Sequence, residues 1–324
     1  MNAIALSPPT PNPSLESLAE QAAKFAEAAR ARSTRRAYAS DLRDFQDFCI
    51  GHGLHYLPST PETVALYITY LASRVTVSTI RRRLAAITYH HRQMGCDSPA
   101  TPRRHFLVRE VLAGISRSLG VLQQGAEPIL GDAVRRFVAA CPENLVGIRD
   151  KALITLAYAS GSRRSELASI WEVRDLTFSE QGLYIRMRLS KTDQEKAGRT
   201  IAIPFGEHLE TCPVVSVRTW LDKARISEGP LFRAVDRHGN VSATALSTRS
   251  VAKIVKKAAA RAGLDPARLS PHGLRSGMVT QAAINGAEEY EIARITGHRS
   301  VAVLRKYVRD ANLYRNNASA RLGL

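Results

Sequence analysis

The sequence predicts a mainly α-helical protein of two domains, with a small β-hairpin inside the second domain. Apolar residues recur at intervals of three and four along most of the chain, which is the spacing of helices that cover a core. This periodicity is interrupted near residue 124, and a clear strand-like alternation occurs in one place. With 324 residues and 44% hydrophobic content, the chain is long enough to form two cores.

Five helices are predicted in the first half of the chain. The clearest start is TPE at residues 60–62, where a capping threonine precedes a proline at the first helical position and an early acid. In the most N-terminal helix, Leu15, Leu18 and Phe25 recur at helical spacing. The predicted helices cover residues 14–32, about 34–51, a stretch from about 60, a stretch after Thr79, and about 106–119.

A linker is predicted where the periodicity is lost. The stretch at residues 118–130 contains two glycines, two glutamines and a proline, which is typical of a connection between domains. We place the boundary near Gln124 and expect a flexible leader at residues 1–13, a first domain at 14–122 and a second at 123–324.

The second domain is predicted to be mainly helical, with one hairpin. Leu183, Ile185, Met187 and Leu189 alternate with polar or aromatic residues, and a second short run, residues 200–203, follows after a polar turn. This pattern indicates two antiparallel strands within a helical domain.

The charge of the chain favours a polyanionic partner. Lys and Arg outnumber Asp and Glu by 46 to 29, which gives a formal net charge of +17. Such a field attracts nucleic acid. A basic surface that only maintains solubility explains the charge equally well, so local motifs have to decide between the two.

Nothing in the sequence indicates secretion or a membrane. The four cysteines have no C-x-x-C spacing, and a disulfide framework is unusual in a chain of this length. The first 15 residues contain prolines and lack the basic start of a signal peptide. The longest uncharged apolar run, 152–159, is far shorter than the roughly 20 residues that span a bilayer. We expect a soluble, cytoplasmic protein.

Tyr307 lies in surroundings that suit phosphoryl chemistry. It stands among basic residues, and it follows the His298 of a Gly297-His298 pair by nine positions. A tyrosine attacks a phosphodiester when its proton is removed and fixed donors meet the negative charge that builds on phosphorus. Such a site requires at least two cations and an acid for the leaving oxygen, so we looked for constrained arginines, a lysine and histidines.

The stretch YASGSRRSEL supplies one constrained arginine. An apolar helix breaks at Gly161 and restarts, which puts Arg163 at a helix start, and Glu166 follows three residues later in position to brace the guanidinium. A surface arginine beside a helical acid is the commoner explanation of such a pair.

The stretch LSPHGLRSG supplies a second arginine. His272 and Arg275 lie three residues apart at a predicted helix start, so both side chains are on one face. A capping histidine explains this pair equally well when it is considered alone.

Together, these elements resemble the tyrosine recombinase (phage integrase) family. YASGSRRSEL, the hairpin lysine Lys191, HGLR, and a Gly-His pair with a tyrosine nine residues later occur in the order and spacing of that family. The first half, with TRRAYASDLRDFQDFC and STIRRRLAAITYHHRQMG, resembles the helical core-binding domain of the Cre recombinase branch. The resemblance covers nearly the whole chain, and a five-part match is highly specific.

The resemblance implies which residues bind the scissile phosphate. Tyr307 would be the nucleophile that forms a 3′-phosphotyrosyl bond. Arg163 and Arg275 would clamp the phosphate, because a planar guanidinium can donate two hydrogen bonds, and His298 would donate another.

It also implies which residues transfer protons and support the site. Lys191, delivered by the hairpin, would be the general acid to the leaving 5′ oxygen. His272 would assist removal of the tyrosine proton or hold the site in shape, and Glu166 would orient Arg163.

The implied fold is a core-binding, SAM-like helical domain followed by a catalytic domain of the DNA breaking-rejoining type. The implied partner is double-stranded DNA with a specific inverted-repeat site, held by a homo-tetramer that exchanges strands through a Holliday junction. Integration, excision and resolution remain equally open as outcomes.

No cofactor and no metal are expected. In the resembled family, arginines, lysine and histidines supply the positive charge that other phosphoryl-transfer enzymes obtain from Mg²⁺, and this sequence has no acidic cluster to hold that ion. Cys49, His52 and His55 have a spacing that is reminiscent of zinc ligands. They lack a fourth ligand, so a helix end with exposed imidazoles is the preferred interpretation.

Arginines of the first domain are candidates for DNA contacts. A run of arginines is usually a solvated helix face, but on a domain that grips DNA we favour contacts with phosphates and base edges. The candidates are Arg35, Arg36, Arg81, Arg82, Arg83 and Arg92.

Some positions depart from the family pattern, and some alternatives stay open. Ser162 stands where the family usually has an apolar residue, Ile295-Thr296 replaces the usual leucine before Gly297-His298, and Ser276 stands where a histidine is frequent. Tyr314 is a rival nucleophile with the wrong spacing from the Gly-His pair. The residues after Tyr307 either fold back on their own domain or dock on a neighbouring subunit.

Two other functions use the same features. A type IB topoisomerase has similar residues and relaxes DNA without exchanging partners. A degenerate recombinase that only binds DNA is the alternative from a different class, and the intact set of candidate residues argues against it.

Overall fold

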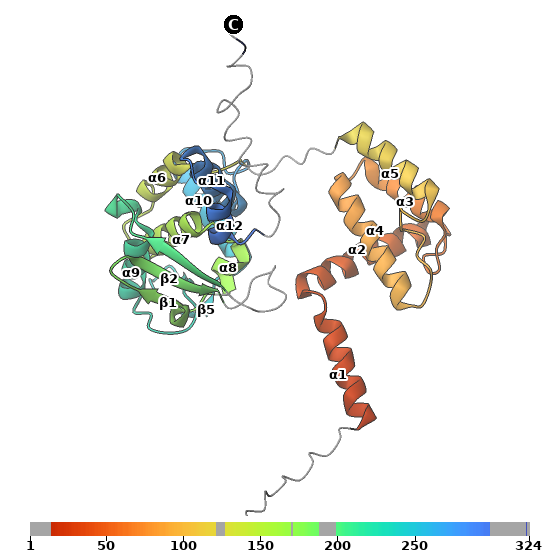
Figure 1. Ribbon diagram of the computed structural model, residues 1–324, viewed down its shortest axis with the longest axis horizontal. Coiled ribbons are helices and arrows are strands. Elements are labelled where there is room, and N and C mark those ends of the chain that lie inside the picture. Colours follow the sequence, from red (N-terminus) through yellow and green to blue (C-terminus); the bar gives the residue numbers. More distant parts are fainter. Residues whose placement is uncertain (1–13, 121–126, 170, 188–198, 299–321, 323–324) are drawn as a thin grey trace, which may run out of the picture. The chain divides into compact units, whose positions relative to one another are not determined.

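The computed structural model describes residues 14–120, 127–169, 171–187, 199–298 and 322. The chain forms two compact units, Met1–Gln124 and Gly125–Leu324 (Figure 1). The leader predicted at residues 1–13 and the central part of the predicted linker lie outside the described residues. The roles expected of the two domains stay predictions.

Among its described residues, the first unit contains five helices. They are α1 (Leu15–Ala28), α2 (Arg32–Gly51), α3 (Pro61–Ala72), α4 (Val77–Gln93) and α5 (Phe106–Leu119). Helices α2 to α5 pack together, with α3 against α5 and α2 against α4 as the most extensive contacts. The predicted bounds of the fifth helix are confirmed.

Threonine caps begin two of these helices. The side chain of Thr60 accepts a hydrogen bond from the backbone N–H of Thr63 at 3.2 Å, and a proline follows the cap, so the predicted start of α3 is confirmed. In α4 the cap is Thr76, whose hydroxyl oxygen accepts from the amide of Thr79 at 3.4 Å. The prediction that this helix begins after Thr79 is therefore wrong.

The apolar face of α1 does not join the core. Leu15 is 84% exposed, Phe25 is 73% exposed, and no residue of the helix is buried. The sequence correctly predicted a helix here, but the predicted range of residues 14–32 extends too far. Helix α1 ends at Ala28, and α2 begins at Arg32. Helical spacing of apolar residues therefore did not mean burial in this helix.

The core of the first unit is built around aromatic side chains. The ring centroids of Phe45 and Tyr67 are 5.0 Å apart, and both side chains are fully buried. Ile68, Ile80 and Ile87 are also fully buried, so α2, α3 and α4 share one core.

The second unit is mainly helical in its described residues. Its helices are α6 (Gly131–Ala139), α7 (Leu145–Ser160), α8 (Arg164–Ser169), α9 (Pro213–Ala224), α10 (Thr248–Arg261), α11 (Pro271–Ile284) and α12 (Glu289–Thr296), with short 3₁₀ turns at Val173–Asp175 and Leu209–Thr211. Helix α7 lies centrally (Figure 1) and contacts α6, α9, α11 and β3 (Arg199–Pro204). This position explains why Ala152 to Leu156 is apolar on nearly all sides.

The antiparallel pairing of the two predicted strands is confirmed as part of a larger sheet, while Leu189 of the predicted first strand lies outside the described residues. β2 (Gly182–Met187) pairs with β3 in antiparallel register, with Ile185 opposite Ile201. The prediction of a hairpin alone is incomplete, because β1 (Leu176–Phe178) pairs with the other edge of β2, and β4 (Arg233–Val235) with β5 (Val241–Ala245) forms a second sheet. The additional strands are too short to give a clear alternation.

Two further features bear on the predictions from composition. The four cysteines are free thiols. In the described part of the chain, no helix is both long and apolar enough to cross a bilayer.

Candidate active site

Helix α11 carries two of the predicted site residues in its first turns. Arg275 is buried, with 4% of its surface exposed. Its Nη1 donates to the carbonyl oxygen of Gly161 at 2.5 Å, and its Nη2 lies 3.1 Å from Nε2 of His298. His272 lies on the exposed side of the same turn. Arg275 therefore connects the end of α7 to the residues after α12.

The turn between α7 and α8 positions Arg163. Its backbone N–H donates to Oε2 of Glu166 at 2.7 Å, and its guanidinium Nη1 donates to Oε1 at 3.0 Å. Glu166 is fully buried and Arg163 is half-buried. The contact that the sequence predicted between these two side chains is present. A carboxylate held at both ends by one residue fixes the orientation of that guanidinium.

His298 follows the left-handed turn at Gly297 that ends α12. Its Nδ1 lies 2.6 Å from the hydroxyl of Thr296. Desolvation by burial, followed by the positive charge of Arg275 and then of Arg163, lowers the pKa of His298 to about 4. A pKa this far below 7 makes the imidazole neutral at neutral pH.

Four of the six predicted catalytic residues thus form one electrostatically coupled group. The pKa of His272 is also lowered, first by desolvation and then by Arg275 and Arg163. The structure brings His272, Arg275, Arg163 and His298 together from segments that are up to 135 residues apart in the numbering of the chain. Lys191 and Tyr307 lie outside the described residues.

Arg199, the first residue of β3, is a fifth basic group that the sequence did not indicate. Its Nη1 donates to the carbonyl oxygen of Ile295 at 2.8 Å and lies 3.3 Å from that of Arg294, both in the last turn of α12. Burial lowers the pKa of its guanidinium, and the charge of Arg163 adds to this effect. The contact joins residues about a hundred positions apart, so no local signal could have revealed it.

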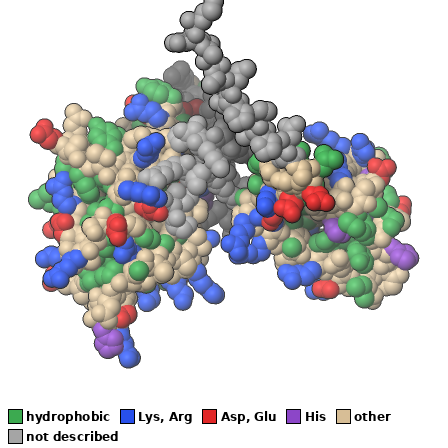
Figure 2. Space-filling view, turned by 90° about the horizontal axis from the view of Figure 1, so that it is seen from below, with side chains coloured by type: hydrophobic (Ala, Val, Ile, Leu, Met, Phe, Trp, Pro, Cys, Tyr) green, Lys and Arg blue, Asp and Glu red, His purple; other side chains and the backbone are tan. Residues whose placement is uncertain are grey.

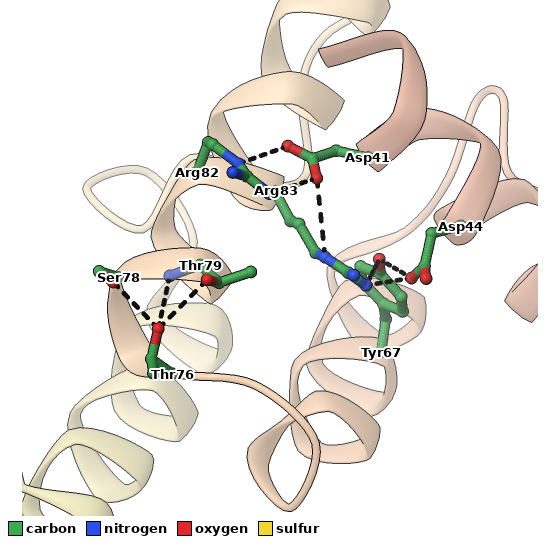
Figure 3. Close-up of polar contacts among 8 residues, drawn as sticks. All are labelled: Asp41, Asp44, Tyr67, Thr76, Ser78, Thr79, Arg82 and Arg83. Atoms are coloured by element: carbon green, nitrogen blue, oxygen red, sulfur yellow. Dashed lines mark hydrogen bonds and ion pairs between the residues drawn. The ribbon is translucent and has the colours of Figure 1, made fainter. Parts of the chain in front are cut away.

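Arg82 and Arg83 of the first unit are held by acidic side chains (Figure 3). Nε and Nη2 of Arg82 each donate to Asp41 at 2.8 Å. Arg83 is paired with Asp44, and its Nη1 donates to the hydroxyl of Tyr67 at 2.9 Å. The side chain of Arg83 is only 14% exposed. The DNA contacts predicted for Arg82 and Arg83 stay predictions. In the structure, both residues link α4 to α2.

Three of the other four candidate DNA contacts are exposed. Arg36, Arg81 and Arg92 are exposed, whereas Arg35 is half-buried and paired with Glu27. Arg81 and Arg92 line a groove of about 890 Å³ between α4 and the segment before α5, together with Arg30 and Arg103. In Figure 2, Lys and Arg side chains occur on the visible face of each unit, with acidic side chains among them.

The donor set of the site is cationic. In the stretches of chain that the structure describes, no group of three or more His, Cys, Asp or Glu side chains is arranged to hold a metal ion. The described site residues present guanidinium and imidazole groups, and a planar guanidinium can donate two hydrogen bonds to the oxygens of an anion.

Comparison with known proteins identifies the family. Residues 128–313 match the model of the phage integrase family, and residues 25–93 match the model of the phage integrase N-terminal SAM-like domain. The first match alone covers more than half of the chain. The chain belongs to the phage integrase family. This membership confirms the resemblance deduced from the motifs, although the Cre-like branch stays a prediction.

Relatives of this phage integrase cover nearly all of its length. It is 39% identical over 308 residues to the integrase/recombinase XerD homolog of Selenomonas ruminantium. The matched region covers 95% of this chain and 90% of the relative. It is 27% identical over 292 residues to the tyrosine recombinase XerD of Rickettsia conorii, with 87% and 90% covered. The chain is a tyrosine-type site-specific recombinase, as the sequence predicted.

Solved structures of other integrases share the fold of this phage integrase. The Tn1549 transposon integrase in complex with transposon right end DNA has a TM-score of 0.61 at 15% identity, with 89% of this chain and 95% of that chain covered. A lambda integrase dimer bound to a COC′ core site has a TM-score of 0.55 at 19% identity, with 91% and 77% covered. These similarities confirm the predicted fold class.

Proposed function

We propose that this recombinase cleaves and rejoins duplex DNA through a 3′-phosphotyrosyl intermediate and exchanges strands by way of a Holliday junction. The observation that carries the proposal is the convergence of Arg163, Arg275 and His298, from three distant segments, on one cationic site. The solved Tn1549 and lambda integrases that share this fold are bound to DNA, which supports DNA as the partner.

In the proposed reaction, the hydroxyl oxygen of Tyr307 attacks the scissile phosphorus, and the bond from phosphorus to the 5′ oxygen breaks. Arg163 and Arg275 bind the non-bridging oxygens and stabilise the charge that develops on them. His272 takes part in removing the tyrosine proton, and Lys191 gives a proton to the leaving 5′ oxygen. Rejoining reverses these steps.

The reaction conserves the bond energy of the DNA backbone. The phosphodiester is exchanged for a phosphotyrosyl ester, and a 5′ hydroxyl later attacks that ester and releases Tyr307. Neither a nucleotide cofactor nor a metal is required by this balance. The described charges of the site, Arg163 and Arg275 above all, supply the electrostatic stabilisation.

We further propose that four copies assemble on two inverted-repeat sites. In this arrangement the first unit contributes DNA contacts through its exposed arginines, including Arg36, Arg81 and Arg92. The second unit holds the cleavage chemistry. The exchange of strands two at a time then requires that only half of the subunits are active at once.

The test is covalent capture on a nicked suicide duplex that carries the site. The site is sought beside the gene as a pair of inverted arms of about one helical turn each. The wild-type protein is expected to form a covalent protein–DNA adduct, and Tyr307→Phe is expected to form none. Tyr314→Phe is the matched control and should retain the adduct. An adduct formed by Tyr307→Phe would exclude the assigned nucleophile.

A supercoiled plasmid that lacks the site distinguishes exchange from relaxation. A recombinase is expected to leave this plasmid supercoiled, whereas a type IB topoisomerase relaxes it rapidly. Rapid relaxation would therefore contradict the proposed strand exchange, even if the covalent adduct forms.

A further inference from the structure

Thr296, the last residue of α12, makes two short contacts through one hydroxyl group. The residue is fully buried. Its Oγ1 lies 2.7 Å from the carbonyl oxygen of Ile292 and 2.6 Å from Nδ1 of His298. A carbonyl oxygen only accepts, so the hydroxyl hydrogen is used in the bond to Ile292. The second contact is then a hydrogen bond only if Nδ1 of His298 carries a proton and donates it.

The other ring nitrogen of His298 leads to the same assignment. Nε2 lies 3.1 Å from Nη2 of Arg275. A guanidinium group only donates, so Nε2 must accept and must be without a proton. Both contacts therefore require the neutral Nδ1–H tautomer. The Nε2–H tautomer would place two donors face to face at Arg275 and two lone pairs face to face at Thr296.

The surroundings of the ring favour this neutral form. The charged groups that influence His298 from other elements are Arg275 and His272 of α11, Arg163 before α8, and Arg199 of β3. The buried acid of this region, Glu166, is engaged by Arg163. On the preceding helix, α12, Glu291 and Arg294 are exposed. Burial and this excess of positive charge both oppose protonation of the imidazole.

We propose that Thr296 is a positioning residue that holds His298 in the Nδ1–H tautomer, so that Nε2 donates to a phosphate only after the ring takes up a proton. The proton is transferred from a hydronium ion of the solvent to Nε2, so that one O–H bond breaks, one N–H bond forms and water is left. A bound phosphate oxygen accepts from Arg275 in place of Nε2, and its negative charge favours the imidazolium. The inference rests on the proposed function in that the natural phosphate is taken to be that of DNA.

The tautomer can be measured without DNA or cleavage. Nitrogen-15 NMR of the full chain with labelled histidines distinguishes the two ring nitrogens, and His298→Asn identifies the signal by its loss. In the wild-type protein at neutral pH, Nδ1 is expected to be protonated and Nε2 not. A His298 signal of the Nε2–H form would overturn the assignment.

Two substitutions test the role of Thr296. Thr296→Ser keeps the hydroxyl and is expected to keep the wild-type tautomer. Thr296→Val keeps the branched shape but removes the acceptor. The ratio of the Nδ1–H to the Nε2–H tautomer is therefore expected to fall by about tenfold, which is the change that the loss of one hydrogen bond produces. An unchanged ratio in Thr296→Val would show that Thr296 does not set the tautomer.

Inorganic phosphate serves as the probe for proton uptake. Saturating phosphate at neutral pH is expected to convert His298 of the wild-type protein to the form with protons on both nitrogens. A ring that stays neutral, whether phosphate binds elsewhere or not at all, would overturn the proton uptake. Because these signals do not depend on a covalent adduct, failure of the cleavage assay is a separate result.

Discussion

Arg81, Arg82 and Arg83 are consecutive in the sequence, yet their surroundings assign them different tasks. The guanidinium of Arg83 is mostly covered and bonded to Asp44 and Tyr67, whereas Arg81 is exposed. Helical geometry turns each successive side chain by about a quarter of a turn, which separates these residues onto different faces. A run of like charges is therefore not one functional unit.

Arg83→Ala is expected to destabilise the first unit. Its loss leaves Asp44 and the hydroxyl of Tyr67 without their cation, and hydrogen bonds to charged groups are worth about 1.5–3 kcal/mol. Because Asp44 is 41% exposed and can be hydrated, we expect a decrease of about 1–2 kcal/mol in the free energy of unfolding. Urea unfolding followed by circular dichroism measures this change.

Arg81→Ala is the matched control on the same helix. Substitution of an exposed residue without such partners is expected to change stability by less than about 0.5 kcal/mol. It should instead weaken DNA binding and reduce the salt slope by about 1, if Arg81 contacts one phosphate. Equal destabilisation by both substitutions would contradict the distinction between the two arginines.

Among the elements, α11 approaches the segment before α6 closely at two glycines, Gly273 and Gly277. A Cβ at Gly277 would lie 1.9 Å from the carbonyl oxygen of Ile129. The backbone of this segment is also hydrogen-bonded to α11: the amide of Ile129 donates to the carbonyl oxygen of Gly273 at 2.8 Å. The position of α11, and with it that of Arg275, therefore depends on this contact.

Gly277→Ala is expected to destabilise the second unit. The added methyl group forces α11 away from Ile129, and overpacking of this kind costs typically about 1–3 kcal/mol. Gly114→Ala in α5 is the control, because a Cβ there meets nothing within 4 Å. It should stabilise the protein by roughly 0.5–1 kcal/mol through its better helix propensity. Differential scanning calorimetry distinguishes the two, and a higher melting temperature for Gly277→Ala would contradict the packing argument.

Arg199 ties strand β3 to the last turn of α12. It donates to the carbonyl of Ile295, and a Cβ at Gly297 would come within 2.5 Å of its Nη1. Gly297 is therefore needed for two reasons. Its own backbone is left-handed, with φ +66°, and the guanidinium of Arg199 lies where a Cβ would be.

Arg199→Ala is expected to loosen the end of α12. The carbonyl of Ile295 loses a charged donor, so amide hydrogen exchange in Glu289–Thr296 should accelerate, by about tenfold for one lost hydrogen bond. Exchange measured by mass spectrometry should remain unchanged in α10, a helix of the same unit that serves as the internal reference. Uniform acceleration in both helices would indicate general destabilisation instead.

Elements and site differ in how far the sequence could predict them. The alternation of Leu183, Ile185 and Met187 gave β2 correctly, and the i,i+3 spacing gave the contact between Arg163 and Glu166. In contrast, the bond from Arg275 to His298 and the position of Arg199 depend on how distant elements pack. Local periodicity carries no information about such contacts, so only the family resemblance placed His298 near Arg275.

At the scale of the whole molecule, charge and fold have separate effects. The net charge of +17 acts on any polyanion over about a Debye length, roughly 10 Å at moderate salt, without reference to sequence. The site in the second unit instead depends on side chains fixed within hydrogen-bonding distance of one another. Non-specific binding and cleavage should therefore respond differently to salt.

We expect DNA affinity to fall steeply with salt, while the choice of site persists. For contacts with about 6–10 phosphates, affinity decreases by roughly 10³–10⁵ between about 50 and 200 mM salt. Binding to a duplex with the inverted arms and to a scrambled duplex of equal length is measured by fluorescence anisotropy across this range. Both affinities should decrease, because released counterions drive both. Their ratio should decrease much less, since contacts with base edges are not made through counterion release. An affinity independent of salt would mean that the positive charge of the chain serves solubility and not DNA.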